Sequence, residues 1–352
     1  MSTEITIYPL RATKKELCDL LKSMNFKKCK HLWDWPKNAV NFFGFVSEDY
    51  KSFDGVEATV YRASQKEKEI YNGVEWAVHT RVRASGSEFD QRLQNEVIKE
   101  IRKKFGGNFY NDWLGKNRYR IVEGDKRKPV GRGVAIVFEY VVEQFGKLAF
   151  IIPDELKITG KSKIEKFFSQ IDPYKILYNA LVPFVVAGFE YFFKEIFIIL
   201  FKYSKVSKKK LEKKTGNVPF SDILKISKKE MSIPELIAKE YSFQNITEIN
   251  NAYKNWLDID VLRAVNYSKN IGKKRKSIND RITDLIMGRH KIIHNFFCDY
   301  NLNKKRFLQL LNFILKIFNS FLDFLEKEKK IFVRDNYLKI YRKYSFNKKS
   351  YL

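Results

Sequence analysis

The chain has 352 residues, enough for two domains, and its composition of 44% hydrophobic and 15% aromatic residues supports large cores and argues against a globally disordered protein. Lys and Arg outnumber Asp and Glu by 67 to 41, which gives a formal net charge of +26 and indicates a polyanionic partner, most commonly nucleic acid. The three cysteines, Cys18, Cys29 and Cys298, are odd in number and lack zinc-ligand spacing, so a secreted disulfide framework and a cysteine metal site are both disfavoured.

Residues 1–152 mix strand and helix patterns. Thr13 and Glu16 have the spacing of a capping box at the start of a short helix, and a second, amphipathic helix ends at Gly106. Alternating or continuous apolar runs predict strands. These runs are "NFFGFV", "VEATVYRA", "EWAVHTRVRA", "GVAIVFEYVV" and "KLAFII". We therefore expect an N-terminal α+β domain with a mostly antiparallel sheet.

One predicted strand of this domain has a basic face. In "EWAVHTRVRAS", apolar residues alternate with His79, Arg81 and Arg83, so Arg81 and Arg83 are candidates for contacting RNA phosphates. An ordinary solvated face of a sheet explains the same pattern. The aromatic and glycine-rich segment "FGGNFYNDWLGKNRYRI" can either stack on bases or pack as a long loop.

After residue 152 the strand patterns end and long helical patterns begin. We expect an all-α domain over residues 153–330, followed by a basic extension over residues 331–352. Residues 1–152 hold 27 Lys and Arg against 20 Asp and Glu, whereas the rest of the chain holds 40 against 21. The argument for a polyanionic partner therefore concerns mainly the helical part.

Two lysine-rich runs lie in the helical part, at residues 208–214 and 269–276. Such runs are often solvated linkers. The second run directly precedes a helical segment that contains two histidines, which makes its last four residues candidates for binding RNA. These are Lys273, Lys274, Arg275 and Lys276.

The most apolar window of the chain covers residues 181–204. Its middle contains Glu190, Lys194 and Glu195, and charged side chains are costly in hydrocarbon. We interpret the window as a buried helix of a soluble protein. Because the first residues, "MSTEITIYPLRATKKE", lack the basic-then-apolar pattern of a signal sequence, we expect a cytoplasmic protein without a membrane partner.

The segment "INDRITDLIMGRHKIIHNFF" has helical spacing of apolar residues, and Arg289 occupies a central position of the apolar stripe. A guanidinium facing a core is costly unless it is paired or opens onto a polar cavity, and it cannot lose its proton. Arg289 therefore either has a carboxylate partner, as in an ion pair that joins two helices, or lines a site.

His290 and His294 are four residues apart and share a helix face, a spacing that can bind a metal. No third ligand stands nearby in the sequence, so we expect neither a metal nor a cofactor. His294 comes five residues after Arg289, which puts the two side chains about 140° apart on a straight helix. They can cooperate only if the helix begins or bends near Gly288, or if two copies of the helix face each other.

The sequence "RHKIIH" matches the R-x4-H pattern of the HEPN superfamily. The upstream "LVPFVVAGFEYFFKEIF" resembles a first HEPN helix with one acidic residue, Glu190, among apolar ones. The segment "EYSFQNITEINNAYKNWLDID" is similar to the "FSFQN" segment of the RiboL-PSP-type branch, and a long apolar helix follows the motif. The resemblance covers about residues 165–330 and implies a HEPN-like helical bundle for the C-terminal domain.

What the resemblance implies is a metal-independent endoribonuclease that works as a homodimer, with a composite site where the motifs of two protomers meet. Arg289 would hold the phosphate oxygens, and His294 would move protons, since an imidazole titrates near neutral pH. Glu190 is the candidate partner of Arg289, and His290 and Asn295 are candidates for orienting the substrate.

The family also suggests the biological context: a toxin or effector of anti-phage defence by abortive infection that cleaves tRNA or other cellular RNA. The N-terminal domain would then have a sensing, regulatory or RNA-binding role, and an antitoxin or a phage-derived trigger would control the enzyme. The alternative is a non-catalytic module that binds nucleic acid or protein through its basic helical half.

Overall fold

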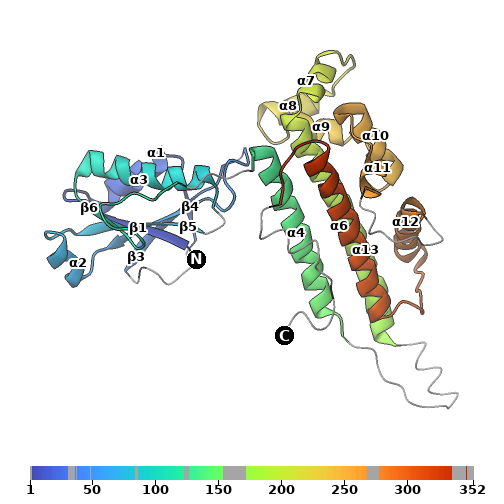
Figure 1. Cartoon of the computed structure of the whole chain (residues 1–352), viewed down its shortest axis with the longest axis horizontal. Helices are drawn as coiled ribbons and strands as arrows, with labels where there is room; N and C mark the ends of the chain where they lie inside the picture. Colours follow the sequence, from blue (N-terminus) through green and yellow to red (C-terminus); the bar gives the residue numbers. More distant parts are fainter. Residues whose placement is uncertain are drawn as a thin grey trace. The chain divides into compact units, whose positions relative to one another are not determined.

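A computed structural model describes residues 2–30, 36, 38–47, 49–83, 86–122, 127–153, 172–267, 277–334 and 346 (Figure 1). The chain divides into two compact units, Met1–Arg132 and Gly133–Leu352. The division lies at Arg132, before the expected boundary after residue 152.

The first unit contains an antiparallel sheet of seven strands among its described residues, in the order β2-β3-β4-β5-β1-β6-β7. The expected α+β class with an antiparallel sheet is thereby confirmed. The strands are β1 (Ser2–Tyr8), β2 (Lys27–Cys29), β3 (Ala39–Phe45), β4 (Val56–Arg62), β5 (Trp76–Arg83), β6 (Asn108–Asn111) and β7 (Gly115–Lys116).

Helices α1 (Lys14–Ser23) and α3 (Glu88–Phe105) lie over one face of this sheet (Figure 1). Their apolar sides pack on the strands in a single core, in which Leu17 and Val97 meet strand residues such as Val78. The short helix α2 (Gln65–Ile70) connects β4 to β5. The capping box predicted at Thr13 and Glu16 begins α1, and its hydrogen bonds are formed in both directions.

The prediction of two strands over "GVAIVFEYVV" and "KLAFII" is wrong, because both segments belong to one helix, α4 (Pro129–Ile151). β-branched and aromatic residues suggested strands. However, the buried residues Val134, Phe138, Val141 and Phe145 are spaced three or four apart, which is the helical period. The 23-residue length of α4 is also too great for a strand.

The second unit is helical, as expected, in all the elements that the structure describes. Its longest helices are α4, α6 and α13, which run alongside one another in Figure 1. Besides α4 they are α6 (Pro173–Tyr203), α7 (Lys205–Glu212), α8 (Phe220–Ser227), α9 (Ile233–Ala238), α10 (Ile246–Leu257), α11 (Val261–Val265), α12 (Ile278–Asn295) and α13 (Lys304–Lys327).

Aromatic side chains hold this unit together. Phe192 of α6 stacks on Phe318 of α13 with ring centroids 3.8 Å apart, and Phe145 of α4 stacks on the same Phe318 at 6.1 Å. Tyr253 of α10 donates a hydrogen bond of 2.6 Å to the backbone oxygen of Phe193. The core therefore fixes α6 against α4, α10 and α13. Helix α6 carries Glu190, which belongs to the candidate site described below.

The apolar window at residues 181–204 falls in α6, which is buried along most of its length, as expected. Among the described residues, one helix is long and apolar enough to cross a membrane by length and composition, and that helix is α13. However, 61% of its apolar window is buried in the protein, and the core helices of soluble proteins have the same composition. The length and composition of α13 are therefore only weak evidence that it crosses a membrane.

Helices α4 and α6 approach closely at Gly188. A Cβ atom at this position would lie 2.5 Å from Cε1 of the Phe145 ring, so Gly188→Ala is expected to lower the free energy of unfolding by about 1–3 kcal/mol through overpacking. Gly288→Ala is a matched control in α12, since its Cβ would meet no described atom within 4 Å. It is expected to raise stability by roughly 0.5–1 kcal/mol. Denaturant unfolding measures both, and equal effects would contradict the close packing.

Candidate active site on helix α12

Helix α12 is continuous through Gly288. It begins with a capping box in which the Ser277 hydroxyl accepts from the Asp280 N–H at 3.1 Å and the Asp280 carboxylate accepts from the Ser277 N–H at 3.2 Å. It ends at Phe296, whose φ of 49° is left-handed. Because the helix neither begins nor bends at Gly288, Arg289 and His294 point about 140° apart within one chain.

The apolar stripe of α12 is buried only in its first half. Ile278 and Ile282 are buried, whereas Leu285 and Ile292 are half-buried and Ile293 is 40% exposed. Arg289, which the sequence places in the stripe, is half-buried and does not enter the core. The second half of the helix therefore leaves apolar and polar side chains accessible together.

Glu190 of α6 lies close enough to Arg289 and to Gln244 to interact with both. Burial raises the pKa of Glu190, while attraction to Arg289 and a hydrogen bond from the Gln244 side chain oppose the rise. No direct ion pair joins Glu190 to Arg289, and the buried Glu190 Oε1 has no hydrogen-bond partner among the residues that the structure describes. The expected ion pair between Glu190 and Arg289 is therefore not formed directly, and the two side chains interact only through an attraction at longer range.

Sequence reasoning missed Gln244 as a site residue. The signal was available, because Gln244 lies within the "YSFQN" stretch on which the family resemblance depends. Three stretches that are far apart in the sequence, around Glu190, Gln244 and Arg289, meet at this point of the second unit.

The two histidines form a pair on the outer face of α12. The rings of His290 and His294 have centroids 4.4 Å apart and an interplanar angle of 44°. Both side chains are exposed, as is Asn295 at the end of the helix. Within the described ranges, no three His, Cys, Asp or Glu side chains gather as they would around a metal ion.

The segment after α12 is tied to α6 by a reciprocal pair of hydrogen bonds. The Asp299 N–H donates to Asn179 Oδ1 at 2.8 Å, and Asn179 Nδ2 donates to the Asp299 backbone oxygen at 3.1 Å. Asn179 is buried. These bonds fix the end of α12, and with it His294, relative to α6.

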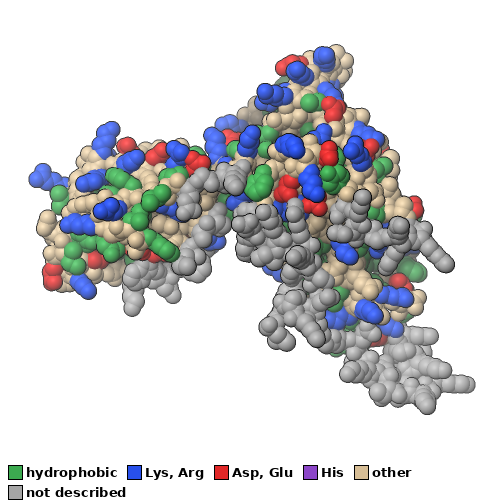
Figure 2. Space-filling view, in the orientation of Figure 1, with side chains coloured by type: hydrophobic (Ala, Val, Ile, Leu, Met, Phe, Trp, Pro, Cys, Tyr) green, Lys and Arg blue, Asp and Glu red, His purple; other side chains and the backbone are tan. Residues whose placement is uncertain are grey.

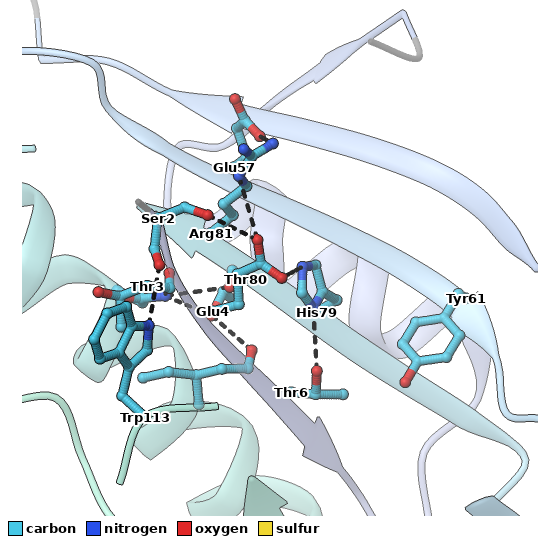
Figure 3. A network of polar contacts seen from close by, with 12 residues as sticks. Ser2, Thr3, Glu4, Thr6, Glu57, Tyr61, His79, Thr80, Arg81 and Trp113 are labelled. Carbon is cyan, nitrogen blue, oxygen red and sulfur yellow. Dashed lines mark hydrogen bonds and ion pairs between the residues drawn. The ribbon is translucent and has the colours of Figure 1, made fainter. Parts of the chain in front are cut away.

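The predicted basic face of β5 is largely neutralised by carboxylates on the neighbouring strands (Figure 3). Arg81 Nε lies 3.5 Å from a Glu4 carboxylate oxygen, and Arg83 lies 3.5 Å from Glu57. His79 is buried, contacts Thr6 at 3.1 Å and has its pKa lowered chiefly by burial. This geometry favours the ordinary sheet face over an RNA-binding role for Arg81 and Arg83.

Lysines gather over α7 in the second unit (Figure 2). Lys210 and Lys214 are engaged with Asp258 and Glu240. The neighbouring lysines Lys208, Lys209 and Lys213 are exposed and form no ion pair within the described chain. The other basic run, with Lys273, Lys274, Arg275 and Lys276, lies outside the described residues.

Glu190→Gln is expected to raise stability at neutral pH. A folded-state pKa above the ordinary glutamate value means that the folded protein binds the proton more tightly than the unfolded chain. Stability therefore falls as the pH rises from the ordinary glutamate pKa through the folded one. The neutral amide removes this fall. The melting temperatures of the wild type and of Glu190→Gln are measured from about pH 4, near the ordinary glutamate pKa, to about pH 8. The same pH dependence of the melting temperature in both proteins would contradict the prediction.

Comparison of the chain with models of protein families, with curated proteins and with solved structures finds no match in any of the three.

Proposed function

We propose that the protein is a metal-independent endoribonuclease of the HEPN type, in which Arg289 and His294 from two copies of the chain form each active site. The observation that carries this proposal is the continuity of α12, which keeps the two side chains of one copy apart while leaving both accessible. Glu190 supports the assignment, because an unpaired buried oxygen beside Arg289 is suited to hold a guanidinium in place while it binds phosphate.

The chemistry needs only side chains of this kind. RNA carries its own nucleophile in the 2′-hydroxyl, which attacks the adjacent phosphorus and expels the 5′-oxygen of the next nucleotide. His294 accepts or delivers the proton, and Arg289 stabilises the negative charge that develops on the phosphorane oxygens. The products are a 2′,3′-cyclic phosphate and a 5′-hydroxyl, and no metal or other cofactor takes part.

An apolar rim beside the site supports the homodimer. Ile293 on α12 and Phe296, Phe297 and Tyr300 after it are 40–93% exposed. Exposed apolar residues gathered in this way mark interaction surfaces. In a two-fold dimer with antiparallel α12 helices, a symmetry axis that passes between residues 291 and 292 puts Arg289 of one copy and His294 of the other at the same height along the helix axes.

The biological role follows from the enzyme class. We propose that the enzyme cleaves tRNA or other cellular RNA in the cytoplasm as a toxin of anti-phage defence by abortive infection, which is the role that the family resemblance implies. The N-terminal unit then provides sensing or regulation, and an antitoxin or a phage-derived trigger sets the activity.

Purified protein incubated with end-labelled RNA in EDTA tests the proposal. We expect cleavage that leaves 2′,3′-cyclic phosphate ends, and we expect a single 2′-deoxynucleotide at a cleavage position to block cutting there, because it removes the nucleophile. Retention of RNA without cutting would overturn the proposal and favour the non-catalytic binding module.

A further inference from the structure

A pocket of about 380 Å³ opens beside Glu190 in the second unit. Its volume lies within the range of about 300–1,000 Å³ that is usual for small-molecule sites. One wall is formed by α6 and the other by the stretch from Ala238 to Gln244. The side chains that can engage a ligand there are Glu190, Tyr191, Lys194, Lys239, Tyr241 and Ser242.

Tyr191 and Tyr241 supply aromatic surface to this pocket, and hydrogen bonds to its hydroxyl hold Tyr241 in place. Trp256 Nε1 donates to the Tyr241 hydroxyl at 3.1 Å, and Asn255 Nδ2 donates to it at 3.4 Å. Tyr191 is 40% exposed and its ring packs beside Tyr140 with centroids 5.3 Å apart. Accessible rings held in place are the usual platforms on which nucleic-acid bases stack.

Cationic groups stand at the same pocket. Lys194 and Lys239 are exposed, and neither forms a direct ion pair within the part of the chain that the structure describes. Ammonium groups next to aromatic rings match the two parts of a nucleotide, since the rings take the base and the cations take the phosphate.

The pocket is connected to the candidate active site through Glu190. The same carboxylate lines the pocket, accepts a hydrogen bond from Gln244 and attracts Arg289. A phosphate held by Arg289 would therefore lie next to the pocket, and the nucleotide that carries this phosphate could reach it. Ser242 and Gln244 add polar groups on the opposite wall of the pocket, and such groups can form hydrogen bonds to the edge of a base.

We propose that this pocket binds one nucleotide of single-stranded RNA next to the scissile phosphate. The base stacks on Tyr191 and Tyr241, and the neighbouring phosphate contacts Lys194 and Lys239. Because stacking depends on ring area, purines are favoured over pyrimidines. The inference rests on the proposed ribonuclease function, from which it takes the position of the RNA.

The test uses the full chain with His294→Ala, which lacks the group that moves the proton but keeps Arg289 to hold the phosphate, so it is expected to bind RNA without cutting it. The probe is a short single-stranded RNA with a fluorescent label and one 2-aminopurine. Tyr191→Leu and Tyr241→Leu are each expected to weaken binding about tenfold and to restore 2-aminopurine fluorescence. Tyr191→Phe keeps the ring and should bind as before, which separates stacking from misfolding. Tyr241→Phe also keeps the ring but loses the hydrogen bonds from Trp256 and Asn255, so it should bind more weakly than the wild type and more tightly than Tyr241→Leu. Phe184→Leu, an exposed aromatic of α6 outside the pocket, is the matched control.

The outcomes separate the pocket from the enzyme. Loss of binding in the two leucine variants supports the pocket even if the wild-type protein cuts no RNA. Unchanged binding in both would overturn the pocket even if the wild-type protein cuts RNA in EDTA. AMP is titrated in parallel, and binding of AMP that depends on the tyrosines while RNA binding does not would also overturn the proposal, because it would assign the pocket to a free nucleotide.

Discussion

Arg289→Ala and His294→Ala are each expected to lower the rate of RNA cleavage by about 10²–10⁴-fold. The first variant removes the cation that stabilises the phosphorane, and the second removes the group that moves the proton. Both residues lie on the accessible half of α12, so neither substitution takes apolar area out of the core. Cleavage rates in EDTA measure the loss, and melting temperatures close to that of the wild type show that the fold is intact.

Arg289→Lys is the matched control for charge. Lysine keeps the positive charge but lacks the planar fork that binds two phosphate oxygens at once, so most of the activity should still be lost. Full activity in Arg289→Lys would show that Arg289 contributes only its positive charge and not two directed hydrogen bonds to the phosphate. Wild-type cleavage in Arg289→Ala or His294→Ala would contradict the assignment of the site.

Arg334→Ala is expected to lower the free energy of unfolding by about 3–5 kcal/mol. The Arg334 side chain is 0% exposed, and its Nη2 lies 2.5 Å from an Asp323 oxygen and 2.7 Å from a Glu326 oxygen. Its Nη1 donates to Asn319 Oδ1 at 3.0 Å. Alanine leaves two mostly buried carboxylates of α13 next to each other without the cation between them.

Denaturant unfolding of Arg334→Ala measures this loss. Arg263→Ala, which removes an exposed arginine of α11, is the matched control and should change stability by no more than about 0.5 kcal/mol. Adding Asp323→Asn and Glu326→Gln to Arg334→Met should recover part of the stability, because the triple variant has no unpaired charge at this position. A loss below about 1 kcal/mol in Arg334→Ala would show that the cluster behaves like a surface ion pair.

The local sequence predicts the elements whose patterns are strong. The capping box at Thr13, the amphipathic helix that ends at Gly106 and the alternating strands all appear in the structure, because short-range hydrogen bonds and the burial period determine them. Helix α4 was misread because it is apolar on several sides, so its period is hidden and its valines suggest a strand. Its length was the better guide.

The residues of the candidate site stay a prediction from the sequence, whereas the structure shows the surroundings of each residue, which the sequence predicted less well. Position in the apolar stripe suggested a core location for Arg289, but the structure leaves the stripe only half-buried in the second half of α12, and burial of that half depends on tertiary contacts that periodicity does not report. The carboxylates beside Arg81 and Arg83 come from strands whose register the sequence does not specify.

In the proposed enzyme, each active site takes its arginine from one copy of the chain and its histidine from the other. Co-expression of an Arg289→Ala chain and a His294→Ala chain with different affinity tags allows the mixed dimer to be purified. This dimer contains one intact pair, so it should cleave RNA in EDTA at about half the wild-type rate, while each parent variant is inactive. A mixed dimer as inactive as its parents would contradict a site shared between two chains.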